Sequence, residues 1–176
     1  TGQASLSLRK CSKPVIAMVN GAAAGAGCGI ALGADFRIMT EESCLLTAFS
    51  SVGLPGDTGC IYHLKQIVGL AKTIELMALS PRIYGKEAFR LGLTTRLAPD
   101  GKLEEETQSF TEKLLRRPLS ALALQKQLYY EVFYRDYMAY SRLEAENLAK
   151  AGASADHREA VTAFIEGRKP IFNQND

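Results

Sequence analysis

A run of small residues at 20–33, directly after an apolar stretch at 14–19, constrains this chain more than any other segment. The apolar stretch is typical of a buried β-strand, and Asn20-Gly21 is typical of the turn that ends it. The segment 20–33 contains five glycines. Small residues of this kind let a ligand come close to the main chain. A helix beginning near Ala26 would present amide groups that have no partner within the helix. The segment therefore predicts a backbone site for an anion or a polarised carbonyl oxygen.

The hydrophobic periodicity predicts an α/β chain with a helical C-terminal half. Pro118 is the best internal boundary, and we expect a core over 1–117 and a helical region over 118–176. A complete second domain does not fit after that boundary. Expected strands cover 14–19, 35–40, 45–48 and 93–98, and expected helices cover 3–10, 26–33, 58–68, 70–79, 86–91, 103–116, 120–150 and 156–166.

Composition limits the classes of partner. The 176 residues carry 21 basic and 19 acidic side chains without a long block of either sign, so nucleic acid is not an expected partner. No apolar run is long enough to cross a bilayer, and no signal peptide is visible, so we expect no membrane partner. A targeting segment ahead of Thr1 stays open, and without one we expect a cytoplasmic protein.

The cysteines and histidines do not have the spacing of a metal site. No pair follows the C-x-x-C pattern, and His63 and His157 lie far apart, so we expect no metal. Small buried thiols in a reducing compartment are the simplest interpretation of the four cysteines. These are Cys11, Cys28, Cys44 and Cys60.

Several motifs recur in the order found in one known family. Lys-Pro-Val-Ile-Ala-Met-Val-Asn-Gly at 13–21 and Ala-Gly-Ala-Gly at 24–27 resemble the crotonase family, the enoyl-CoA hydratase/isomerase superfamily. Ala-Asp-Phe-Arg-Ile at 34–38 and Thr-Ala-Phe-Ser at 47–50 continue the resemblance in register, and it covers essentially the whole chain. It implies a crotonase-like ββα spiral core with a C-terminal helical segment, an acyl-CoA substrate, and assembly as a homotrimer or hexamer. It implies no cofactor other than the coenzyme A of the substrate thioester.

The resemblance also implies an N-terminal section that this sequence does not contain. In the family, that section carries the first oxyanion-hole amide and much of the pocket for the CoA nucleotide. We therefore expect the chain to be the C-terminal portion of a crotonase. The missing section would lie on a separate chain or would have been removed.

By the same resemblance, the backbone N–H of Ala26 is the second oxyanion donor, and Gly25 and Gly27 keep the approach to it open. A tight strand-to-helix turn would need the same glycines, which is the structural alternative. Lys169, next to Arg168, is a candidate contact for the CoA phosphates, although a solvated surface charge explains it equally well.

The two glutamates that add water in the family's hydratases fall on Gly29 and Phe49, and neither residue can move a proton. Asp57 is the remaining candidate, with Phe49 and Leu54 as expected walls of the substrate pocket. The sequence therefore favours an enoyl-CoA double-bond isomerase in which Asp57 is the acid/base. A nucleophilic Asp57, as in aryl-CoA dehalogenases or thioester hydrolases, stays open. So do a hydratase-like protein, an inactive CoA-binding protein, and a purely structural Asp57 that caps a helix starting at Thr58.

Two further groups have structural interpretations. His63 falls within an expected helix without an obvious acidic partner, and we expect it to be partly exposed. A series of tyrosines at helical spacing predicts packing or a subunit contact rather than a cofactor site. These are Tyr129, Tyr130, Tyr134, Tyr137 and Tyr140.

Overall fold

Short strands from one repeating unit build two small sheets. The computed structural model describes residues 2–172, and in it β1 and β2 precede α2 just as β3 and β4 precede α3. The first strand of each unit joins a parallel sheet of order β1-β3-β6. The second strand joins a sheet of order β2-β4-β5, in which only β5 runs antiparallel to its neighbour. The strands are β1 (Ile16–Val19), β2 (Ala22–Ala24), β3 (Phe36–Thr40), β4 (Cys44–Leu46), β5 (Ile83–Tyr84) and β6 (Arg96–Ala98).

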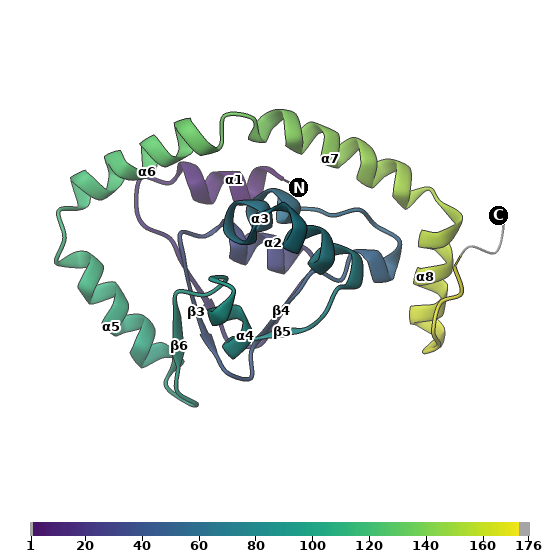
Figure 1. Ribbon diagram of the computed structural model, residues 1–176, viewed down its shortest axis with the longest axis horizontal. Coiled ribbons are helices and arrows are strands. Elements are labelled where there is room, and N and C mark those ends of the chain that lie inside the picture. Colours follow the sequence, from purple (N-terminus) through teal and green to yellow (C-terminus); the bar gives the residue numbers. More distant parts are fainter. Residues whose placement is uncertain (1, 173–176) are drawn as a thin grey trace.

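The C-terminal helices form an arc around this core. In Figure 1, α5 to α8 run around the outside, while α2 and α3 lie at the centre beside the strands. A 3₁₀ turn, η1 (Ser50–Val52), stands between β4 and α3 and contacts α8. The α-helices are α1 (Gln3–Lys10), α2 (Ala26–Gly33), α3 (Cys60–Leu79), α4 (Gly85–Arg90), α5 (Leu103–Leu115), α6 (Leu119–Phe133), α7 (Tyr137–Gly152) and α8 (Ala155–Glu166).

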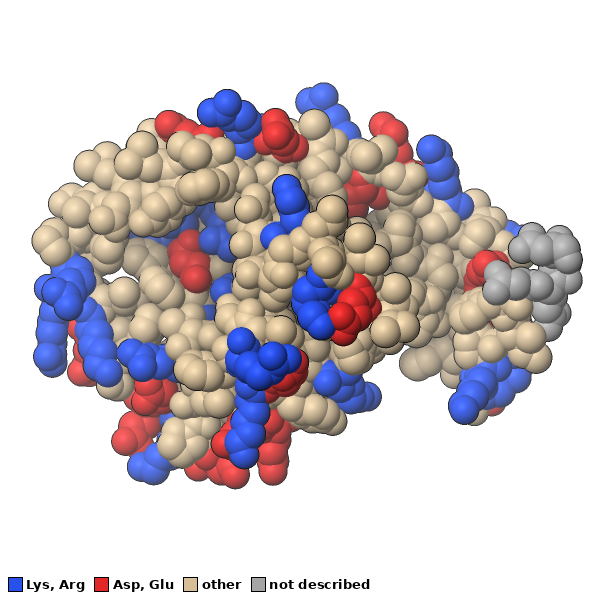
Figure 2. Space-filling view, in the orientation of Figure 1, with Lys and Arg blue, Asp and Glu red and all other residues tan. Residues whose placement is uncertain are grey.

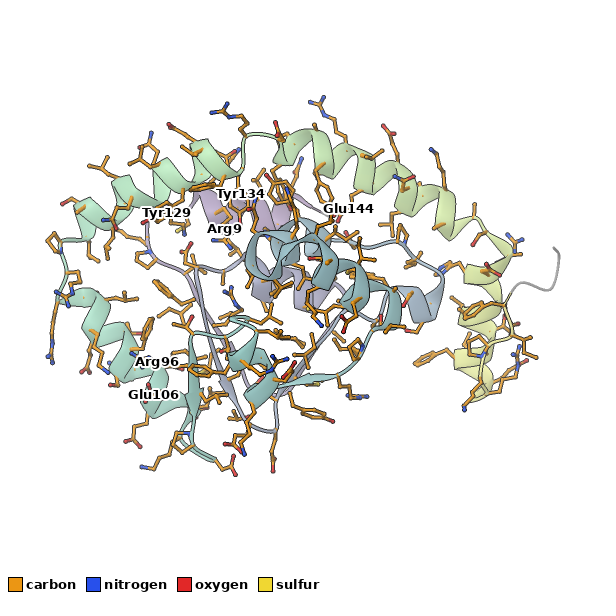
Figure 3. The ribbon with its side chains drawn as sticks, in the orientation of Figure 1. Arg9, Arg96, Glu106, Tyr129, Tyr134 and Glu144 are labelled. Carbon is orange, nitrogen blue, oxygen red and sulfur yellow. The ribbon has the colours of Figure 1, made fainter. Side chains whose placement is uncertain are left out.

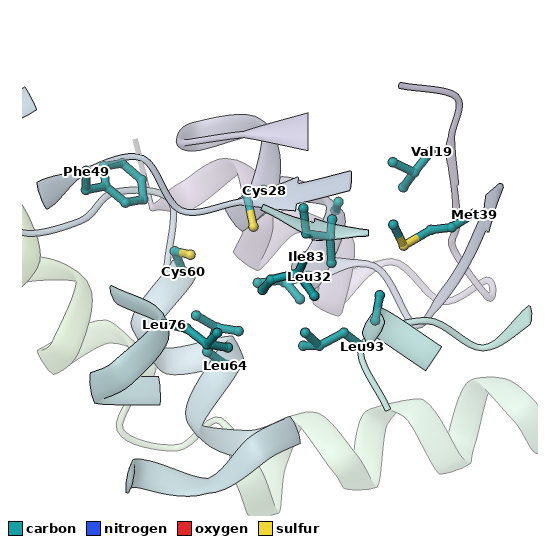
Figure 4. Packing of buried hydrophobic residues seen from close by; sticks show 13 residues of the cluster. Val19, Cys28, Leu32, Met39, Phe49, Cys60, Leu64, Leu76, Ile83 and Leu93 are labelled. Atoms are coloured by element: carbon teal, nitrogen blue, oxygen red, sulfur yellow. The ribbon is translucent and has the colours of Figure 1, made fainter. Parts of the chain in front are cut away.

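The main hydrophobic core lies between α2, α3 and the strands (Figure 4). Leu32 from α2, Met39 from β3 and Leu64 from α3 are at most 1% exposed. A second cluster packs α5 onto the β1-β3-β6 sheet, where the rings of Phe36 and Phe110 meet edge to face at 5.0 Å. Burial of this apolar surface is the main force that holds α2 and α3 in fixed positions.

A buried guanidinium and a partly buried carboxylate join the core to its surroundings. The Arg37 guanidinium donates hydrogen bonds to the carbonyls of Leu93 at 2.6 Å and Ala34 at 2.9 Å, at the negative end of α2. Burial lowers the pKa of Arg37 to about 10, so it stays charged at neutral pH. Asp35 pairs with Arg9 of α1 at 3.4 Å and with Lys126 of α6 at 2.5 Å. This carboxylate therefore holds α1 and α6 against the segment that leads into β3.

Most predicted elements are confirmed, and the exceptions have tertiary causes. The helix predicted over 26–33 matches α2, and the break predicted before residue 70 corresponds to Gly69, whose φ of 75° interrupts α3. The single helix predicted over 120–150 is wrong, because the chain leaves helical geometry between α6 and α7. That break turns Tyr134 and Tyr137 toward α1 and α3, where both are buried. Strands β2 and β5 were not predicted, since their hydrogen bonds come from the distant strand β4.

The surface shows mixed charge. On the face in Figure 2, basic and acidic side chains lie interspersed rather than in areas of one sign. Among residues 2–172, no helix is both long and apolar enough to span a membrane. The expected division at residue 118 stays a prediction; Pro118 stands at the N-cap of α6.

His63 lies inside a cluster of tyrosines. The prediction that it is partly exposed is wrong: its exposed fraction is 0%. The ring stacks on Tyr137 at 5.7 Å, and its Nδ1 lies 3.3 Å from the Tyr134 hydroxyl, while Nε2 has no partner among the described atoms. The packing role predicted for the tyrosines is confirmed for Tyr130, Tyr134, Tyr137 and Tyr140, whereas Tyr129 is 55% exposed. Of the four cysteines, Cys28, Cys44 and Cys60 are buried as expected and Cys11 is exposed.

We expect this buried histidine to make the fold sensitive to acid. Burial, aided by the positive charges of Arg9 and Arg37, lowers the pKa of His63 to about 3. The unfolded chain takes up a proton below about pH 6.5, whereas the folded chain does not, so stability present above that pH is lost as the pH falls toward 3. Between pH 7 and pH 5 this difference amounts to about 2 kcal/mol of unfolding free energy.

Urea unfolding of the wild type and of His63→Phe at both pH values measures this effect. The phenylalanine fits the aromatic surroundings and cannot be protonated. Between pH 7 and pH 5, its unfolding free energy should fall by about 2 kcal/mol less than that of the wild type. Equal losses in the two proteins would show that His63 does not control acid sensitivity.

Candidate active site

The N-terminus of α2 presents a free backbone amide. Gly25 has φ 54° and ψ −119°, a conformation that favours glycine, and its N–H donates to the Leu46 carbonyl at 2.9 Å. This bond fixes the turn to the end of β4. Ala26 is the first residue of the helix, and its N–H donates to no carbonyl within the described chain. The amide therefore points from the positive end of α2 and is available to an incoming oxygen atom.

Asp57 stands in the loop that leads into α3. Its Oδ1 accepts the Thr58 N–H at 2.6 Å. No described residue donates to its Oδ2, and no basic side chain of residues 2–172 pairs with it. The helix begins only at Cys60, with Gly59 as N-cap and without a side-chain cap, so the alternative in which Asp57 caps this helix is wrong. One carboxylate oxygen of Asp57 thus orients the side chain while the other remains available.

Thr58 links the Asp57 loop to α2. Its backbone is held at φ 54°, which is uncommon for a residue with a branched side chain. Its hydroxyl Oγ1 lies 3.1 Å from the Ala26 carbonyl oxygen and 2.8 Å from that of Asp57. A Cβ at Gly29 would come within 2.0 Å of the same Oγ1. Thr58 therefore occupies the space into which any side chain at position 29 would extend.

Glu144 of α7 holds the start of α3. Both of its carboxylate oxygens accept the Gly59 N–H, at 3.2 and 3.1 Å, and the Tyr140 hydroxyl donates to it at 2.6 Å. Figure 3 shows Glu144 extending from α7 toward α3. Burial raises the pKa of Glu144, and the negative charge of Asp57 adds to the increase. Glu144 therefore fixes the turn that carries Asp57.

A single cavity of about 470 Å³ adjoins both the Ala26 amide and Asp57. Its walls are largely apolar, and the C-terminal helices α7 and α8 contribute three of the lining residues. An apolar cavity with few polar groups suits a small organic ligand held by one backbone donor and one acid. The remaining lining residues are Gly25, Ala48, Phe49, Val52, Leu54, Leu148, Gly152 and His157.

Comparison with known proteins identifies the family. The sequence model described as Enoyl-CoA hydratase/isomerase matches residues 3–175. The chain belongs to this family. Its fold agrees with that assignment: the crystal structure of an enoyl-CoA hydratase from Mycobacterium avium subsp. paratuberculosis superimposes with a TM-score of 0.92 at 28% identity, covering 97% of this chain and 69% of that one.

Relatives in the family carry both hydratase and isomerase names. A probable enoyl-CoA hydratase of Rhodobacter capsulatus is 37% identical over 92% of this chain. A 1,2-epoxyphenylacetyl-CoA isomerase of Escherichia coli is 34% identical over 94% of it. The chain spans 63% of the length of each of these two relatives. The names alone therefore do not separate the two activities.

The structure brings together most of the site residues predicted from the sequence. Gly25, Ala26, Phe49, Leu54 and Asp57 line one cavity, although the chain separates the first from the last by 32 residues. This enoyl-CoA hydratase/isomerase family member thus places a free amide and an acid against the same apolar space.

Two predicted residues lie elsewhere. Gly27 lines a separate cavity of about 220 Å³ beside β1 and β2, and a Cβ there would meet no atom within 4 Å. Gly27 therefore lies outside the cavity of Asp57, and its expected effect on the approach to Ala26 stays a prediction. Lys169 is exposed and does not line the cavity of Asp57.

The sequence reasoning missed three residues beside the candidate site: Glu144, Leu148 and His157. All three lie on α7 and α8, far along the chain from the glycine-rich turn, and no local motif marks them. The one available signal was that His157 is one of only two histidines in the chain. Within residues 2–172, no group of three or more His, Cys, Asp and Glu side chains is arranged to hold a metal ion.

Proposed function

We propose that this protein moves the carbon–carbon double bond of an enoyl-CoA thioester, with Ala26 as an oxyanion donor and Asp57 as the acid/base. The observation that carries the proposal is the shared cavity, which holds one free amide and one carboxylate with an unoccupied oxygen. The positions of the hydratase glutamate pair hold Gly29 and Phe49. Since a side chain at position 29 would collide with Thr58, the geometry of the site also disfavours that pair.

The reaction needs one proton to leave one carbon and return to another. The thioester oxygen accepts the hydrogen bond of the Ala26 N–H, and the carboxylate of Asp57 removes a proton from the carbon next to the double bond. In a 3-enoyl thioester that carbon also adjoins the thioester carbonyl, so the electron pair of the C–H bond forms a bond to the carbonyl carbon and the carbonyl π pair moves to the thioester oxygen, where the amide and the dipole of α2 stabilise the negative charge. Asp57 then returns the proton at the other end of the allylic system. No redox cofactor takes part, and we propose that none is bound beyond the coenzyme A of the substrate.

The proposal also covers the contacts with CoA, the oligomeric state and the compartment. We propose that Lys169 meets the CoA phosphates, that a further oxyanion donor comes from residues outside this chain, and that the protein assembles as a trimer or hexamer in the cytoplasm. Exposed apolar side chains on α8, such as Phe164 at 83% and Ile165 at 78%, support a contact with another surface.

Product analysis in D₂O tests the reaction type. The intact protein is incubated with a 3-enoyl-CoA and, separately, with the 2-enoyl-CoA of the same length. We expect the 3-enoyl substrate to yield the 2-enoyl product, with deuterium entering through the exchangeable carboxyl group of Asp57. A 3-hydroxyacyl-CoA as the main product would identify a hydratase, and conversion of neither substrate would contradict catalysis of this kind.

A further inference from the structure

His157 lies in the cavity of Asp57 but has no part in the proposed proton transfer. Among the ten residues that line this cavity, Asp57 and His157 are the two with titratable side chains. The other walls are glycine, alanine or larger apolar side chains. A polar ring in such a wall needs a partner whenever a ligand displaces water from it.

The surroundings of the ring determine which nitrogen carries its hydrogen. Nδ1 lies 2.7 Å from the carbonyl oxygen of Val52. Because a carbonyl oxygen can only accept, Nδ1 must be the donor, and the neutral ring then has its lone pair on Nε2. Nε2 bonds to no described residue. Unlike Nε2 of His63, it is not buried. It is therefore an accessible hydrogen-bond acceptor.

Backbone contacts hold this ring in place. The His157 N–H donates to the Ser154 hydroxyl at 3.1 Å, which caps the start of α8. Gly53, at φ 67°, packs so closely that a Cβ there would lie 2.9 Å from the His157 nitrogen. The start of α8 thus packs directly against the loop after η1. Because of this packing, the acceptor nitrogen has a fixed position before any ligand binds.

We propose that Nε2 of His157 accepts a hydrogen bond from a hydroxyl group on the acyl chain, so that the site selects hydroxylated acyl-CoA thioesters over unsubstituted ones. This inference rests on the proposed function, since it assumes an acyl-CoA ligand in the cavity. A plain alkyl chain would remove water from Nε2 and leave it unpaired, whereas a hydroxyl group restores the lost bond. A keto group would not, because both it and Nε2 are acceptors.

Binding of saturated acyl-CoA thioesters tests the proposal without any turnover. A set of one chain length, unsubstituted or with the hydroxyl moved along the chain, is titrated into the intact protein by calorimetry. We expect one hydroxylated member to bind about tenfold more tightly than the unsubstituted parent. His157→Phe should abolish that preference, and His157→Gln, whose amide oxygen can accept, should retain part of it.

The outcomes separate this inference from the proposed function. Equal affinity for all members, or a preference that persists in His157→Phe, would overturn the role of His157. Failure of every member to bind would overturn it as well. If the preference is present but the wild type does not isomerise enoyl-CoA, only the proposed reaction fails.

Discussion

Asp57→Asn is expected to lower the isomerisation rate about a thousandfold, because it removes the one carboxylic acid among the described residues that line the cavity. Asparagine keeps an oxygen that accepts the Thr58 N–H, so the loop should retain its shape. The amide does not act as a base at neutral pH. The loss should therefore appear in kcat, while the affinity for a saturated acyl-CoA stays within about twofold of the wild type.

Steady-state kinetics and calorimetric titration of the intact protein measure both quantities. Asp100→Asn is the matched control, since it makes the same chemical change at an exposed turn outside the cavity. It should leave rate and affinity unchanged. Wild-type turnover in Asp57→Asn would refute the assignment of Asp57. Loss of both turnover and binding would show instead that Asp57 is needed to shape the site.

A covalent role for Asp57 makes a different prediction for the wild-type protein. If its free oxygen attacks a thioester carbon, a labelled substrate should leave a mixed anhydride on the wild-type carboxylate as the thiolate departs, and attack on an aryl carbon should leave an aryl ester as the halide departs; mass spectrometry detects either adduct. Proton transfer leaves no such adduct. We expect none, because an acid that only shuttles a proton forms no bond to carbon.

Gly29→Ala is expected to destabilise the protein by about 2 kcal/mol through overpacking. The new Cβ would lie 2.0 Å from the Thr58 hydroxyl oxygen and 3.2 Å from the Asp57 carbonyl oxygen. Thr58 is held by its bond to the Ala26 carbonyl and cannot move aside without disturbing the cavity. The same collision means that a glutamate introduced at position 29 would not restore a hydratase site.

Urea unfolding of single and double variants measures the collision. Thr58→Gly removes the obstructing side chain and relieves its positive φ, so Gly29→Ala should cost at least about 1 kcal/mol less in that background. Gly27→Ala, in the same turn of α2 with open space around it, is the control and should be neutral or slightly stabilising. Additive effects of the two substitutions at 29 and 58 would contradict direct contact between them.

Local sequence was enough to locate the glycine-rich turn. A strand, a small-residue turn and a helix over 26–33 follow from periodicity and from glycine, because these features depend on neighbours a few residues away. The order of motifs along the chain added the family and singled out Ala26 and Asp57. Both residues lie in one cavity, as the sequence suggested.

Contacts between segments far apart in the sequence determined the features that local sequence did not predict. β2 forms only because β4 supplies its partners, and α6 ends before α7 because Tyr134 and Tyr137 gain burial against α1 and α3. His63, which local sequence placed partly at the surface, is enclosed by the same tyrosines.

The glycine-rich turn therefore determined by itself where a free backbone amide lies, since an amide at a helix start needs only local geometry. Tertiary structure alone decided what surrounds that amide. Thr58 fills the place of a side chain at Gly29, and α8 brings His157 to the cavity from more than a hundred residues away. No local pattern encodes such neighbours, because they depend on how the helices pack around the core.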